Sequence, residues 1–131
     1  TSEHLLTFKG GEKMNFAEFL KEKRTQKGLT LRKMAELIDI APAYLSDIEK
    51  RKRNAPSQDV LERIVEILEL SDEEKNEMYD LAAMDKDTIA PDITEYVSTN
   101  NTIRVALRKA KDLDLGEKEW MKIIEEMENK K

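Results

Sequence analysis

The sequence predicts an all-α protein, in which a five-helix bundle is followed by a short helical C-terminal segment. Apolar residues recur three and four positions apart along most of the chain, which is the spacing of one helix face. No stretch alternates strongly between apolar and polar residues as a half-buried strand does. The composition agrees, since 39% of the residues are charged and only 4 Gly and 3 Pro interrupt the pattern.

The chain is expected to have three parts. Residues 1–14 show no helical stripe and include two adjacent glycines, so we predict a flexible N-terminal tail. The stretch that ends at Met14 is also what a purine-rich ribosome-binding site would encode if translated in frame, which leaves Met14 as an alternative start. Residues 15–85 are predicted to form the bundle, and residues 86–131 are predicted to form a separate helical segment.

The first two helices are predicted from an apolar stripe and from their end signals. The first helix is expected over residues 15–27, because Gly28 follows it as a C-terminal glycine does. The second helix is expected over residues 31–38, because Thr30 precedes it as an N-cap. The residues expected to face the core are Phe16, Phe19, Leu20, Met34, Ala35 and Leu37.

A third short helix follows after a turn of only three residues, 39–41. It is predicted over residues 42–51, with Pro42 in the first turn, where a missing N–H costs nothing. Two short helices joined so closely must cross steeply, and small or apolar side chains must fill the space between them. The residues expected to do so are Ala35, Ile40, Leu45 and Ile48.

Two further helices complete the predicted bundle. One is expected over residues 58–69 after Ser57 as N-cap, and the other over residues 72–84. Ser71 and Glu74 have the spacing of a capping box at the start of the second of these. The predicted core positions are Val60, Leu61, Ile64, Val65, Leu68, Met78, Leu81 and Ala82.

The C-terminal segment is predicted to contain three helices, over residues 92–98, 102–113 and 117–129. The last helix carries an apolar stripe at helical spacing on one face. This stripe is either an ordinary core or a seam for a second copy or a partner, because a few short helices hide apolar surface poorly by themselves. Its residues are Trp120, Ile123, Ile124 and Met127.

Charge is distributed unevenly along the chain. The formal net charge is -5, yet residues 15–54 hold ten basic and six acidic side chains. Residues 55–131 hold eleven basic and twenty acidic side chains, so the acidity belongs to the back half. A basic front on an acidic body is expected if one surface meets phosphate and another meets protein.

Several functional classes lack support in the sequence. The chain has no Cys, a single His at position 4 and no Gly-rich phosphate loop, so we expect no enzyme, no bound metal and no cofactor. No apolar stretch approaches the roughly 18 residues of a membrane span, so we expect no membrane partner. A cytoplasmic location is the corresponding expectation.

The segment from helix one to helix four resembles the Xre/Cro/C1 family of helix-turn-helix regulators over about residues 16–70. The resemblance rests on the small Ala35, the run Tyr44-Leu45-Ser46-Asp47-Ile48-Glu49, the basic cluster after it and Asn54-Ala55-Pro56-Ser57. It implies a lambda-repressor-like fold of five helices and dimers that read palindromic operators. It also implies an ion pair between Arg24 and Glu49, a structural element in this family.

This sequence departs from the family pattern at two positions. Leu31 stands where the family often has a Gln that touches the DNA backbone. The contacts to the DNA backbone are therefore expected from Thr30, Arg32 and Lys33 instead. Arg51 stands where the family often has Gly, so the turn after the third helix is expected to differ while the site gains a cation.

The predicted DNA-contacting residues surround the amino end of the third helix, where the helix dipole favours negative charge. The predicted base contacts are Pro42, Ala43, Tyr44 and Asp47. The predicted contacts to the DNA backbone are Thr30, Arg32, Lys33, Ser46, Lys50, Arg51, Lys52, Arg53 and Asn54.

Two functional hypotheses follow. In the first, the chain is a sequence-specific transcriptional regulator, a homodimeric repressor that inserts residues 42–51 into the major groove of double-stranded DNA; an activator role stays open. In the second, it is an antitoxin or another partner-binding module, which holds a toxin or regulatory protein through its C-terminal helices.

Overall fold

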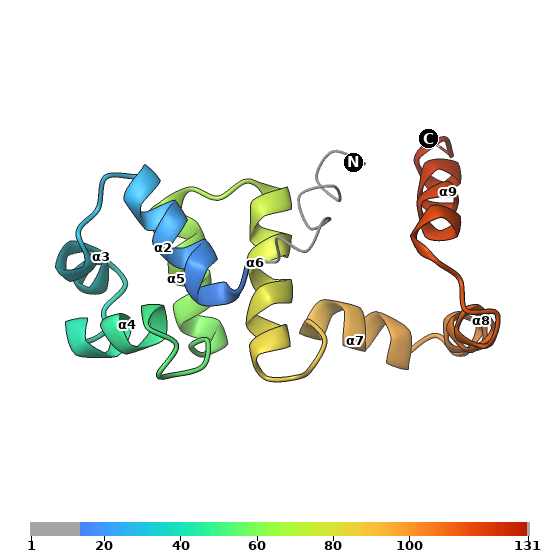
Figure 1. Cartoon of the computed structure of the whole chain (residues 1–131), viewed down its shortest axis with the longest axis horizontal. Coiled ribbons are helices and arrows are strands. Elements are labelled where there is room, and N and C mark those ends of the chain that lie inside the picture. Colours follow the sequence, from blue (N-terminus) through green and yellow to red (C-terminus); the bar gives the residue numbers. More distant parts are fainter. Residues whose placement is uncertain (1–13, 131) are drawn as a thin grey trace. The chain divides into compact units, whose positions relative to one another are not determined.

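The structure, a computed structural model, describes residues 14–130. This part of the chain contains eight helices, α2 to α9, which form two compact units (Figure 1). The first unit runs to Ala90 and the second begins at Pro91. The predicted tail lies outside the described residues except for Met14, which packs against the core of the first unit. The predicted division at residues 1–14, 15–85 and 86–131 stays a prediction.

The first unit is the predicted five-helix bundle. No helix end differs from the predicted one by more than about two residues, which is the usual uncertainty of helix ends. The helices are α2 (Phe16–Gln26), α3 (Leu31–Leu37), α4 (Pro42–Glu49), α5 (Gln58–Leu68) and α6 (Asp72–Asp85).

Side-chain caps explain where several of these helices begin. The Thr30 hydroxyl accepts a hydrogen bond from the Lys33 backbone N–H at 3.0 Å, which starts α3 as predicted. Ser71 and Glu74 form the predicted reciprocal capping box at the start of α6. Ser57 is the N-cap of α5, but its side chain makes no capping hydrogen bond.

The core of this unit follows the predicted stripes with one exception in α3. Met34 and Ala35 are fully buried as predicted, but Leu37 is 41% exposed and Ile38 takes the buried position. At about 100° per residue, Ile38 falls between Met34 and Ala35 on the helix surface, whereas Leu37 falls beyond Met34 on the outer side. The prediction for Leu37 was therefore wrong. Leu31 packs against the core, which explains an apolar residue where the Xre/Cro/C1 family often has Gln.

Helix ends in this protein close through residues in the left-handed conformation. Gly28 has a φ of 74°, and the N–H groups of Gly28 and Leu29 return to α2 carbonyls in the pattern that terminates many helices. Arg51 adopts a φ of 64° after α4, which is a left-handed conformation that glycine enters easily. The turn after α4 therefore keeps the geometry that a glycine would give, contrary to the expectation that it would differ. Four acidic residues do the same elsewhere: Asp39, Glu69, Asp87 and Asp114.

The second unit contains three helices, α7 (Pro91–Ser98), α8 (Asn101–Asp112) and α9 (Glu117–Glu128), close to the predicted ranges. Ala110 is the one residue within these three helices that is buried. The larger apolar side chains of this unit are therefore half-buried or exposed.

Replacing Arg51 with Gly should raise the free energy of unfolding by about 1 kcal/mol, because a left-handed φ strains every residue with a Cβ. Gly28→Ala is the matched opposite change. A Cβ at Gly28 meets nothing within 4 Å, so its cost comes from the backbone conformation alone. Chemical denaturation of the full chain should show the two variants moving in opposite directions. An Arg51→Gly variant less stable than the parent would contradict the assignment of strain.

Candidate nucleic-acid interface

Helices α3 and α4 lie side by side at one end of the first unit and form the helix-turn-helix (Figure 1). Ala35 is fully buried, which lets the two backbones approach. The turn between them is closed by a hydrogen bond from the Ile40 N–H to the Ala35 carbonyl at 3.0 Å. The Arg63 Nε on α5 donates to the Ile38 carbonyl at 2.8 Å and so satisfies an acceptor at the end of α3.

Helix α4 is anchored on one side and free on the other. Leu45 and Ile48 are buried in the core, as predicted. Pro42 occupies the first turn, and no side chain caps the amino end at Ala41. The dipole at this end is therefore not offset by a local acceptor, and it favours an approaching anion.

The residues predicted to contact base edges all reach the surface of α4. Pro42 and Ala43 are exposed, while Tyr44 and Asp47 are half-buried. Ser46, a predicted backbone contact, is half-buried beside them. The accessibility on which the DNA-binding hypothesis depends is therefore present in this chain.

Exposed cations flank this face from two elements. Arg32 and Lys33 project from α3, and Lys33 forms an ion pair with Glu36 at 3.1 Å. A second group, which we call the basic turn, follows α4 directly. It consists of Lys50, Arg51, Lys52 and Arg53, all exposed, and Asn54 is exposed next to it. Thr30 is exposed as well, although its hydroxyl oxygen already caps α3.

Arg24 on α2 and Glu49 at the end of α4 form a bidentate ion pair. Arg24 Nε lies 2.7 Å from Glu49 Oε2, and Arg24 Nη2 lies 2.9 Å from Glu49 Oε1. The remaining guanidinium nitrogen donates to the Leu29 carbonyl at 2.8 Å. The hydrogen bond with Glu49 raises the pKa of Arg24 above its ordinary value. The pair thus ties α2, the α2–α3 loop and α4 together.

One contact at the site was not anticipated from the sequence. The Arg53 guanidinium lies over the Tyr44 ring, with its central carbon 5.7 Å from the ring centroid. The two residues are nine positions apart, and only the reversal of the chain at Arg51 brings them together. A sequence pattern without that turn geometry gives no sign of the pair.

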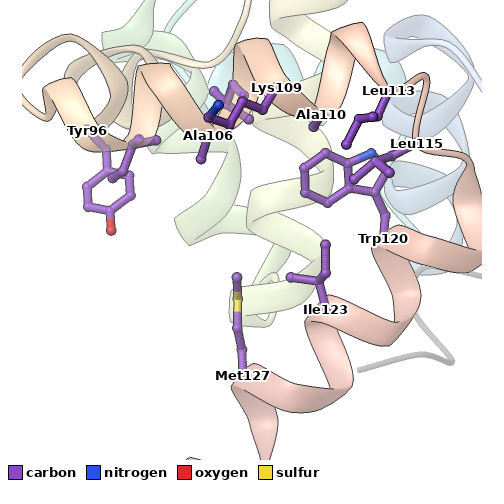
Figure 2. A pocket seen from close by; sticks show the side chains of 11 residues that line it. Tyr96, Ala106, Lys109, Ala110, Leu113, Leu115, Trp120, Ile123 and Met127 are labelled. Carbon is purple, nitrogen blue, oxygen red and sulfur yellow. The ribbon is translucent and has the colours of Figure 1, made fainter.

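The predicted dimer or partner face lies in the second unit and lines an open apolar groove of about 490 Å³. Figure 2 shows Trp120, Ile123 and Met127 projecting from α9 into this groove. Ile124 is half-buried and is not among the lining residues. The opposite wall comes largely from α8 and the segment after it, through Ile103, Ala106, Leu107, Ala110, Leu113 and Leu115.

Two other features are absent from the part of the chain that the structure describes. Between residues 14 and 130, no group of three or more His, Asp or Glu side chains is placed to hold a metal ion. Across the same residues, none of the helices combines the length and the apolar character needed to cross a membrane.

Replacing one partner of the Arg24–Glu49 pair should destabilise the fold more than replacing both. The two side chains are only 10% and 6% exposed, so Glu49→Leu leaves a buried charge without its partner and should cost about 3 kcal/mol or more. The double variant Arg24→Met with Glu49→Leu should recover much of this loss. Denaturation midpoints of the singles and the double would check this, with Glu36→Gln in the exposed Lys33 pair as a neutral control. Additive losses would argue against a coupled pair.

The comparison with protein families agrees with this geometry. A family model described as helix-turn-helix matches residues 20–75. No curated protein matches the chain. A solved structure described as a SinR protein/SinI protein complex aligns with 22% sequence identity and a TM-score of 0.42, over 86% of this chain and 94% of that one. Residues 20–75 are therefore similar to a helix-turn-helix domain, in agreement with the arrangement of α3 and α4.

Proposed function

We propose that the protein is a sequence-specific transcriptional regulator that binds duplex DNA as a dimeric repressor and inserts α4 into the major groove. The observation that carries this proposal is the accessible outer face of α4 between two groups of exposed cations. The major groove is wide enough to admit one helix, and its base edges are distinct for every base pair. A cytoplasmic location belongs to the proposal.

The roles of the individual residues follow from their chemistry. Ala43 and Pro42 offer apolar surface to a thymine methyl group, and the Asp47 carboxylate can accept from a cytosine amino group. Arg32 and Lys33 on α3 and the basic turn after α4 are exposed and can meet phosphates. Phosphate contacts set position and strength, while the few base contacts set sequence preference.

We further propose that a second copy of this chain fills the apolar groove of the C-terminal unit. Helices α7 to α9 bury only Ala110, so this unit has little core of its own. Helix α8 carries four basic residues and one acidic, whereas α9 carries five acidic residues and two basic. In a two-fold arrangement, α8 of one protomer can meet α9 of the other with opposite charge, as a self-complementary interface requires. The dimer would then set the spacing of two half-sites at about one helical turn.

The same groove supports a second candidate function. An apolar helix of a toxin or another regulatory protein would bury the same residues, and the chain would then act as an antitoxin or partner-binding module. A small toxin-like gene beside the gene for this chain would favour this second function. An isolated or divergently transcribed gene would favour the regulator.

Two substitutions separate base reading from phosphate binding. Asp47→Ala should relax the preference at one base pair by about 1–3 kcal/mol and leave other positions unchanged. Lys50→Ala should instead weaken binding to all sequences and lower the slope of log K against log salt by about 0.9. Selection of bound duplexes from a random pool, followed by salt titrations, measures both. A selected consensus without palindromic symmetry would contradict the dimeric mode of binding.

Charge placed in the groove should dissociate the dimer. Met127 lines the groove and is 64% exposed, so Met127→Asp does not disturb a core but puts a carboxylate where the second copy must pack. The dimer dissociation constant should rise about tenfold or more. Met84→Asp is the matched control, because Met84 is 61% exposed and lies on α6. Analytical ultracentrifugation of both variants would decide, and identical behaviour would place the dimer contact elsewhere.

A further inference from the structure

We propose that Tyr44 is a positioning residue for DNA binding, whose ring holds the Arg53 guanidinium ready for a phosphate beside the amino half of α4. This inference rests on the proposed function. It gives Tyr44 a role that differs from direct reading of a base edge. It rests on the placement of two side chains, on the turn that joins them and on the lack of a competing partner for Arg53.

The backbone on both sides of Arg53 is fixed. After α4, the Lys52 N–H donates to the Asp47 carbonyl at 2.8 Å, and Arg51 turns the chain back with its φ of 64°. Downstream, Ala55 and Pro56 are buried. Arg53 is therefore held between an anchored turn and an anchored loop, and its side chain is directed back along α4.

The Tyr44 ring provides a fixed platform. It is half-buried and packs against the hydrophobic core, so it loses little freedom when a guanidinium lies over it. A cation–π contact of this kind occupies no N–H group of the arginine, so these groups are free to match two oxygens of a phosphate. An arginine held in place beforehand loses less conformational entropy on binding than a mobile one.

The contacts of the exposed cations also favour Arg53 as a phosphate ligand. Lys33 is already paired with Glu36, which offsets part of its charge. Among the described residues, the Tyr44 ring is the one group that Arg53 contacts through an ion pair, hydrogen bond or ring contact. The positive charge of Arg53 is therefore available to a DNA phosphate. Because Arg53 lies beside the exposed face of α4, that phosphate would border the groove that α4 enters.

A double-mutant cycle on a short duplex of random sequence tests this role. Arg53→Ala should lower the salt slope by about 0.9. Tyr44→Leu should weaken binding about two- to fivefold, whereas Tyr44→Phe, which keeps the ring and lacks the hydroxyl, should retain the parent affinity. In the Arg53→Ala background, Tyr44→Leu should have no further effect. Thermal unfolding of each variant confirms that the fold is intact.

The possible outcomes separate the inference from the proposed function. If Tyr44→Phe loses as much affinity as Tyr44→Leu, the hydroxyl makes the contact and the positioning role is wrong. The same holds if the effects of Tyr44→Leu and Arg53→Ala are independent. If Tyr44→Leu unfolds, the exposed Arg53→Ala still decides, because an unchanged salt slope overturns the proposal. A parent chain that fails to bind any duplex would overturn the proposed function together with the inference.

Discussion

The orientation of α4 depends on the bidentate ion pair between Arg24 and Glu49. Helix α4 has only eight residues, and such a short helix has little propensity to hold its own direction. Leu45 and Ile48 fix its depth in the core, but apolar contacts are not directional. The two parallel hydrogen bonds at Glu49 are directional, and the third one, to the Leu29 carbonyl, extends the constraint to the loop before α3. The angle at which the outer face of α4 is presented follows from this arrangement.

Most of the fold could be predicted because its signals are local. Helix ends were marked by Thr30, Ser71 with Glu74, Pro42 and Gly28, whose effects reach no further than a few residues. The buried stripes of α2, α5 and α6 are long enough for periodicity to identify the inner face. Helix α3 has only seven residues, and there the pattern did not distinguish Leu37 from Ile38.

What could not be predicted depends on geometry between distant positions. The sequence pattern gives no sign that Arg53 returns to the Tyr44 ring, because that contact requires the left-handed turn at Arg51. The family pattern indicated that a non-glycine residue there changes the turn, yet the hydrogen bonds of Arg51 and Lys52 to α4 keep its shape. Likewise, the stripe on α9 was visible, but the wall that faces it across the groove comes from α8.

Substitutions at the helix ends of this chain could raise its free energy of unfolding. Asp39, Glu69, Asp87 and Asp114 adopt the left-handed backbone that glycine enters without strain, and none of them belongs to the basic turn or to the outer face of α4. Glycine at these four positions would relieve backbone strain and leave the proposed DNA-contacting side chains in place. At Glu69 the change would also remove an ion pair with Lys27, and at Arg51 it would remove a cation of the basic turn.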